Sequence, residues 1–389
     1  MTDPQNWHPP ASAIPPTPAY GEYAPGPGVP QQHHADQGPP PGWAPPPRPG
    51  LIPLRPLGFG TLLWAPFEVL RRNPKATFGS ALLVQSAVTL LTLVIMGAVT
   101  FFALSRVASA TPDERDAVEA GSILTIVLAA VVPIALSVIA SALLQGIIVI
   151  EVSRATLGEK LRLGQLWRTA GRRLWPLVGW TLLLSVAVLA AIALVAGFVA
   201  LLVVQGDAWV PVAVVIGIFG GLGLVAAAVW LFTRTSLVPS LIVLERLPIR
   251  RAMGRSWFLT TGYFWRTFGV QFLVALIVNI VAQIVTTPVS LVFSVALSVV
   301  DPNAALEGYV PSIILYVILL FVTLILGAVA SVVQSATTAL IYIDLRMRKE
   351  GLDLELVQFV ESAQSGRNAG QDPYQPNGRS TSPGVVPQA

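Results

Sequence analysis

Arginine and tryptophan residues occur together in three short stretches of the sequence, 57–75, 161–175 and 246–266. In the second stretch the apolar residues share one helical face, whereas Arg168 and Arg172 lie off that face. Guanidinium groups attract anionic phosphates, and tryptophan rings favour the boundary between lipid and water. The pattern predicts basic interfacial helices that contact lipid headgroups or a partner protein through these residues: Arg71, Arg72, Arg168, Arg172, Arg173, Arg250, Arg251 and Arg255. The alternative is that the charges only anchor the helix ends.

Arg234 is a second candidate, because it is the single charged residue within the long apolar run 211–244. A charge inside a bilayer is costly, and by default it indicates a functional site with a partner on a neighbouring helix. Gln145, Gln283, Gln334, backbone carbonyls or a lipid phosphate are the partners we expect. The alternative is a shorter span, which leaves Arg234 at the interface with its long side chain reaching the headgroups. Both interpretations stay open.

Several kinds of chemistry are excluded by composition. The sequence contains no cysteine, and its three histidines lie within the first 34 residues. The sequence therefore excludes thiolate metal sites and cysteine nucleophiles, and it provides no histidine for hydrolysis within the membrane. No span carries the paired carboxylates that many ion-coupled carriers use. We expect a protein without enzymatic activity, without a cofactor or metal, and without a nucleic-acid partner.

The glycines near residue 220 form a cluster that resembles a phosphate-binding loop only in composition. Such a loop needs Lys and Ser or Thr directly after its glycines, and both are absent here. The spacing Gly217-x-x-x-Gly221 in an apolar run is instead typical of two closely packed membrane helices.

The elements that position all these residues are long apolar runs. Of 389 residues, 54% are hydrophobic and 11% are charged, and the mean hydropathy is +0.69. An all-α transmembrane bundle follows, because each run exceeds the ~20 residues that cross a bilayer. We expect kinks at Pro133, Pro239 and Pro288. Six spans are predicted: 76–104, 122–150, 177–204, 211–244, 269–299 and 311–343.

Two tails flank this six-span domain, which we place at 51–362. The segment 1–50 contains 16 prolines and no periodic apolar face, so disorder is expected there and in 363–389. Lysine and arginine are concentrated in the loops on the side of both termini. This bias predicts a multi-pass protein of the plasma membrane with cytoplasmic N- and C-termini.

The second spans of the three helix pairs share one C-terminal pattern, an aliphatic run followed by an acid and an arginine. The acids are Glu151, Glu245 and Asp344, spaced 94 and 99 residues apart. We interpret this as a threefold repeat of an interfacial amphipathic helix and a transmembrane hairpin. The alternative is that acids and arginines merely mark the helix ends, which accounts for the charges but not for the shared spacing.

Three segments resemble a known family: Ile52–Gly58, Arg71–Ala76 and Tyr342–Leu354. They are similar to actinobacterial membrane proteins that have a Pro-rich cytoplasmic tail and are related to the glycerophosphoryl diester phosphodiesterase membrane-domain family. The similarity covers about 51–362, and the last segment is its most specific part. In that family the phosphodiesterase activity belongs to a separate soluble domain, which this chain does not contain. The resemblance therefore implies a membrane module and no catalytic residues.

Three functions remain under consideration. The leading hypothesis is a module that binds membrane lipids, preferably anionic, or a membrane-protein partner through its basic interfacial helices. The second is a transporter or flippase-like component with a polar site around Arg234, to which intramembrane glutamines such as Gln85 and Gln145 belong. The third is a scaffold that recruits Pro-binding partners through its N-terminal tail.

Overall fold

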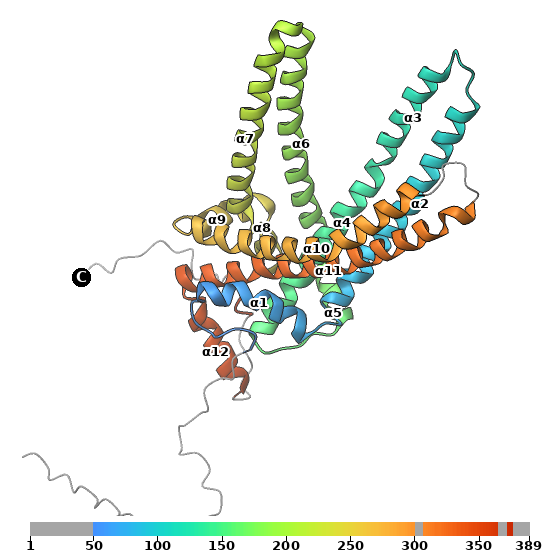
Figure 1. Ribbon diagram of the computed structural model, residues 1–389. Coiled ribbons are helices and arrows are strands. Elements are labelled where there is room, and N and C mark those ends of the chain that lie inside the picture. Colours follow the sequence, from blue (N-terminus) through green and yellow to red (C-terminus); the bar gives the residue numbers. More distant parts are fainter. Residues whose placement is uncertain (1–49, 300–305, 365–371, 376–389) are drawn as a thin grey trace, which may run out of the picture. The chain divides into compact units, whose positions relative to one another are not determined.

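The computed structural model describes residues 50–299, 306–364 and 372–375. Within these residues every regular element is a helix, as Figure 1 shows. Six helical segments are long and apolar enough to cross a membrane, which confirms the predicted all-α, six-span architecture of an integral membrane protein. The segments are Phe78–Ser109, Arg115–Thr156, Leu174–Val204, Asp207–Leu244, Phe264–Ser298 and Val310–Glu350.

A short helix precedes each of three pairs of long helical segments. The first group consists of α1 (Phe59–Arg72), α2 (Phe78–Ser109), α3 (Arg115–Ala129) and α4 (Val131–Thr156). The second consists of α5 (Leu163–Gly171), α6 (Leu174–Val204), the 3-10 turn η1 (Asp207–Trp209), α7 (Val210–Thr235) and α8 (Val238–Leu244). The third consists of α9 (Ile249–Thr260), α10 (Phe264–Val299) and α11 (Leu306–Glu350), with α12 (Leu352–Gln364) after it. The threefold repeat itself stays a prediction.

Two of the three expected kinks coincide with breaks in a span. The second span divides into α3 and α4 at Ala130, just before Pro133, and the fourth divides into α7 and α8 just before Pro239. A proline lacks the N–H that would bond to the carbonyl four residues earlier, and its ring clashes with that carbonyl. Pro288 also lacks this N–H, yet α10 continues through it as one helix.

The buried residues are concentrated where the C-terminal ends of α4, α8 and α11 pack against one another (Figure 1). We call this region the junction. Every residue of α8 is buried, and so is nearly all of the last third of α4. The short helices α1, α5 and α9 each pack against one of these ends. By contrast, the most apolar part of each span contains few or no buried residues in the isolated chain, as expected for surfaces that contact lipid.

The glycine cluster contributes to the contact between α6 and α7. A Cβ atom added to Gly220 would lie 3.2 Å from Val195 Cγ1, and one added to Gly217 would lie 3.7 Å from Val199 Cγ2. A Cβ on Gly221 would meet no atom within 4 Å. The close packing predicted for this cluster is therefore made by Gly217 and Gly220, which lie three residues apart on one helix face, and not by Gly221.

Adjacent glycines in α7 provide a direct test of this packing. Gly220→Val places a branched side chain against Val195, so α6 and α7 must separate, at a cost of about 1–3 kcal/mol. Gly221→Val meets open space and should be tolerated. The thermal unfolding midpoint of the detergent-solubilised protein should fall for the first variant alone. An equal fall for both would show that the α6–α7 contact is placed differently.

Candidate functional site

Three buried carboxylates lie at the junction, one at the end of each of the three helices that meet there. Glu151, Glu245 and Asp344 are 2%, 4% and 1% exposed. An isolated ionised carboxylate is very costly to bury, so each needs a charged or hydrogen-bonding partner. Glu151 accepts a hydrogen bond from Asn73 Nδ2 at 2.9 Å, which ties the loop after α1 to the end of α4.

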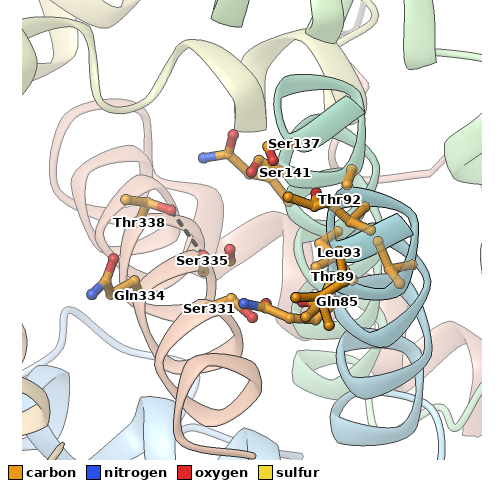
Figure 2. Close-up of a pocket in the computed structure, with 15 residues that line it drawn as sticks. Gln85, Thr89, Thr92, Leu93, Ser137, Ser141, Ser331, Gln334, Ser335 and Thr338 are labelled. Atoms are coloured by element: carbon orange, nitrogen blue, oxygen red, sulfur yellow. Dashed lines mark hydrogen bonds between the residues drawn. The ribbon is translucent and has the colours of Figure 1, made fainter. Parts of the chain in front are cut away.

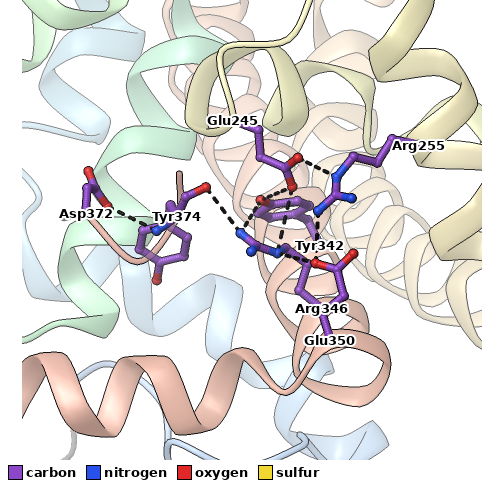
Figure 3. A network of polar contacts seen from close by, with 7 residues as sticks. All are labelled: Glu245, Arg255, Tyr342, Arg346, Glu350, Asp372 and Tyr374. Carbon is purple, nitrogen blue, oxygen red and sulfur yellow. Dashed lines mark hydrogen bonds and ion pairs between the residues drawn. The ribbon is translucent and has the colours of Figure 1, made fainter. Parts of the chain in front are cut away.

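Glu245 belongs to a network of alternating acids and bases, drawn in Figure 3. Its carboxylate forms an ion pair with Arg255 and accepts a hydrogen bond from Tyr342 Oη at 2.9 Å. Arg346 Nε lies 3.8 Å from Glu245 Oε1 and 2.9 Å from Glu350 Oε2. Arg255 Nη2 also lies 2.9 Å from Glu350 Oε2, which closes the circuit. Two acids and two bases thus neutralise each other between α8, α9 and α11.

Asp344 fixes the chain before α1 onto α11. It accepts a hydrogen bond from the backbone N–H of Leu57 at 2.8 Å and pairs with Arg266 and Arg348 at 3.3 and 3.1 Å. Both arginines also donate to the Leu57 carbonyl, each at 2.6 Å. The first and last of the three segments quoted for the family resemblance therefore contact each other through Leu57, Asp344 and Arg348. Their roles here are structural.

Residues 372–375 pack into the same region. Asp372 Oδ2 lies 2.6 Å from Arg154 Nη2, and the Tyr374 carbonyl accepts a hydrogen bond from Arg346 Nη1 at 3.2 Å. The Tyr374 side chain is 1% exposed and its hydroxyl is hydrogen bonded to Thr156 Oγ1. Burial raises the pKa of the Tyr374 hydroxyl, so it stays protonated at neutral pH. Four residues of the C-terminal tail are therefore held by ionic, polar and apolar contacts together.

The structure describes two parts of 363–389, the segment for which disorder is predicted. The first two of those residues belong to α12, and 372–375 lie against the junction with the Tyr374 ring buried. The only hint in the sequence is one tyrosine in an otherwise polar, Pro-containing segment. The expectation for 1–49 and for the remainder of the C-terminal tail lies outside the described residues.

The eight arginines predicted to contact headgroups do not behave alike. Arg255 is committed to Glu245 and Glu350, and Arg72 lies close enough to Glu151 to interact with its charge. The other six have no hydrogen-bond or ion-pair partner in the part of the chain that the structure describes. They are Arg71, Arg168, Arg172, Arg173, Arg250 and Arg251.

A cavity of about 280 Å³, which we call the arginine pocket, is lined by four arginines. Two of them belong to these six. Arg172 and Arg173 come from the turn between α5 and α6, Arg154 from α4, and Arg246 from the turn after α8. Asp372 is the one acid among the lining residues. Arg246 has a φ of 57°, in the left-handed region that non-glycine residues rarely adopt. The pocket carries a net positive charge and suits an anion.

Arg234 lies in the last turn of α7 and contacts the turn between α9 and α10. It donates to Thr261 Oγ1 at 3.2 Å, and its guanidinium carbon lies 5.3 Å from the ring centre of Trp257 and 5.6 Å from that of Phe264. Stacking of arginine on aromatic rings is favourable where both are partly removed from water. These contacts, at the level of a short helix, favour the interfacial interpretation of Arg234.

The glutamines expected around Arg234 lie elsewhere. Gln145 and Gln334 join Gln85 around a cavity of about 550 Å³ between α2, α4 and α11, shown in Figure 2. Gln283 and Arg234 are not among its lining residues. We call this the polar cavity, because ten of its fifteen lining residues carry a hydroxyl or amide group and none is charged. The glutamines are predictable from the sequence as intramembrane polar residues, whereas the serines and threonines beside them carry no such signal.

Comparison with models of protein families, with curated proteins and with solved structures finds no match for this chain. The fold and the two cavities define a multi-pass α-helical membrane protein with an arginine-lined and an uncharged polar site. The family resemblance stated above rests on the three quoted segments alone.

The Glu245 network should be needed for folding. Glu245→Gln removes the charge but keeps the shape, and it leaves Arg255 and Arg346 short of a buried counter-charge. Breaking a buried pair costs about 3–5 kcal/mol, so the thermal unfolding midpoint in detergent should fall strongly. Glu119→Gln, on the exposed surface of α3, is the matched control and should leave the midpoint unchanged. Equal midpoints for the two variants would refute the structural role of Glu245.

Proposed function

We propose that this protein is a plasma-membrane protein with cytoplasmic termini that binds anionic lipid headgroups at its arginine-rich side. The observation that carries the proposal is the arginine pocket, in which Arg172, Arg173 and Arg246 have no partner within the described residues. Glu245 and Asp344 are already paired with other arginines, and Glu151 is hydrogen bonded to Asn73 with the charge of Arg72 nearby, so these three charges are not required to neutralise the acids of the junction.

The chemistry of the pocket suits a phosphate. A guanidinium group presents several N–H donors in a fixed plane, which matches two oxygens of one phosphate. The pocket lies between the N-terminal end of the α6 span and the ends of α4 and α8, the level at which headgroups would meet these helices. The unpartnered Arg71, Arg168, Arg250 and Arg251 extend the attraction for an anionic leaflet beyond the pocket.

The other interpretations have less support. A polar transport site around Arg234 is not favoured, because that residue contacts the α9–α10 turn and not the intramembrane glutamines. A scaffold role would depend on the Pro-rich tail, which lies outside the described residues. We also propose that the protein has no catalytic activity, because the chain lacks cysteine and has no histidine after residue 34.

Neutralising the pocket should weaken binding of anionic lipid. Each basic residue near a membrane surface contributes about 1 kcal/mol, so Arg172→Gln with Arg173→Gln should raise the apparent Kd for phosphatidylglycerol roughly 30-fold. Native mass spectrometry of the detergent-solubilised protein measures this Kd, with phosphatidylcholine as the neutral lipid. The control is Arg106→Gln with Arg115→Gln, which lie at the connection between the first and second spans, at their other ends. Unchanged selectivity in the pocket variant would overturn the proposal.

A substitution that is expected to strengthen lipid binding distinguishes an effect on the site from an effect on folding. Asp372→Asn removes the one acid among the described lining residues and leaves Arg154 with only its longer ion pair to Glu159, so the Kd for phosphatidylglycerol should fall about fivefold, which corresponds to about 1 kcal/mol. Asp353→Asn in α12, which has no hydrogen-bond or ion-pair partner in the described chain, is the control and should have no effect. Weaker binding by Asp372→Asn would show that the carboxylate supports the site and does not compete with the lipid.

A further inference from the structure

The polar cavity lies at membrane depth. Ser335 lies 15 residues before the end of α11, or about 22 Å along a helix, and Thr89 lies 11 residues after the start of α2, or about 16 Å. Both belong to segments that are apolar enough to span a membrane. None of the residues that line the arginine pocket also lines this cavity, so the two sites are distinct.

Many polar groups around the cavity lack a partner. Hydroxyls in helices usually bond to a carbonyl three or four residues earlier, as Ser137, Ser331 and Thr338 do here. Seven other lining side chains form no hydrogen bond in the described part of the chain: Gln85, Thr89, Thr92, Ser141, Gln145, Gln334 and Ser335. Each unsatisfied polar group costs several kcal/mol in hydrocarbon. None of these seven side chains is fully buried, and Ser141 and Gln334 are exposed, so water or a ligand that forms hydrogen bonds can enter the cavity and satisfy them.

The lining limits what that ligand is. No charged residue faces the cavity, so an ionised ligand would have no counter-charge in a medium of low dielectric constant. Hydroxyl and amide groups both donate and accept hydrogen bonds, which complements a ligand with several hydroxyls. The volume of about 550 Å³ lies in the range of small-molecule sites.

We propose that the polar cavity binds an uncharged, polyhydroxylated group. Such a group has two sources, a free polyol in water or the glycosyl headgroup of a lipid. This inference is independent of the proposed binding of anionic lipid, because it concerns other residues and another ligand chemistry.

Because Gly327 has no side chain, the Gln85 amide can lie against α11 at the cavity. A Cβ atom on Gly327 would lie 2.9 Å from Gln85 Nε2, so any other residue at this position would displace the amide. In Figure 2 the Gln85 side chain reaches from α2 across to α11 near Ser331. The close approach of this amide to the α11 backbone indicates that Gln85 is positioned for binding and does not simply extend into lipid.

The absence of native cysteine makes a labelling experiment direct. Thr89→Cys faces the cavity, whereas Leu90→Cys on the next position of α2 is 66% exposed on the lipid side and is the control. In phosphatidylcholine vesicles, N-ethylmaleimide should modify the first at least tenfold faster, because the reactive thiolate requires water or polar surroundings. Equal rates would overturn the proposal.

Protection from labelling identifies the ligand source. Sorbitol that slows modification of Thr89→Cys, where choline chloride of equal osmolarity does not, would indicate a free polyol. Protection only in vesicles that contain a glucosyl diacylglycerol would indicate a lipid headgroup. Protection by neither, or equal protection by choline chloride, would refute a polyhydroxyl site.

A second pair of variants tests the positioning of Gln85. Gly327→Ala should displace the Gln85 amide and weaken protection, whereas Gly97→Ala in α2, which meets no atom within 4 Å, should keep it. Gln85→Ala removes the amide without a clash and should also reduce protection, which guards against misfolding of the Gly327 variant. Full protection in Gln85→Ala would show that the cavity holds its ligand elsewhere.

Discussion

The structure depends on the burial of carboxylates at one end of the spans. Asp344 is 1% exposed, and its buried carboxylate is compensated by a hydrogen bond from Leu57 and by ion pairs with Arg266 and Arg348, which come from three parts of the chain. The same requirement brings α8, α9 and α11 together around Glu245. Lipid cannot provide a driving force between apolar helices, since its tails are as apolar as the side chains. Polar pairing at the junction therefore decides which helix ends meet.

The junction also explains why both cavities exist. The pairs at Glu245 and Asp344 use some of the arginines on this side of the protein, and the unpartnered remainder surrounds the arginine pocket. Further along the spans, the apolar surfaces are mostly exposed, and α2, α4 and α11 leave room for the polar cavity between them. The arginine pocket thus consists of arginines that remain after the junction acids are paired. The polar cavity results from helices that are held firmly only near one end.

The fold was largely predictable from sequence, but the sites were predictable only in part. Hydropathy alone determines the six spans, because length and apolarity are local properties. Proline positions predict the breaks before Pro133 and Pro239 but not the continuity of α10 through Pro288. The pairing of Arg255 with Glu245 and the grouping of Gln85 with Gln334 arise from contacts distant in sequence. No local pattern distinguishes a paired arginine from a free one.

The division between paired and free arginines means that ionic strength acts on them separately. The Debye length is about 8 Å at physiological ionic strength and about 3 Å at 1 M, so added salt screens exposed charges and hardly affects buried pairs. The carboxylates of Asp344 and Glu245 are buried and their arginine partners are at most 28% exposed, whereas Arg168, Arg250 and Arg251 are exposed. High salt would therefore weaken the attraction of this protein for anionic surfaces while its helix ends stay joined. Ionic strength becomes an external control of surface attraction that leaves the architecture intact.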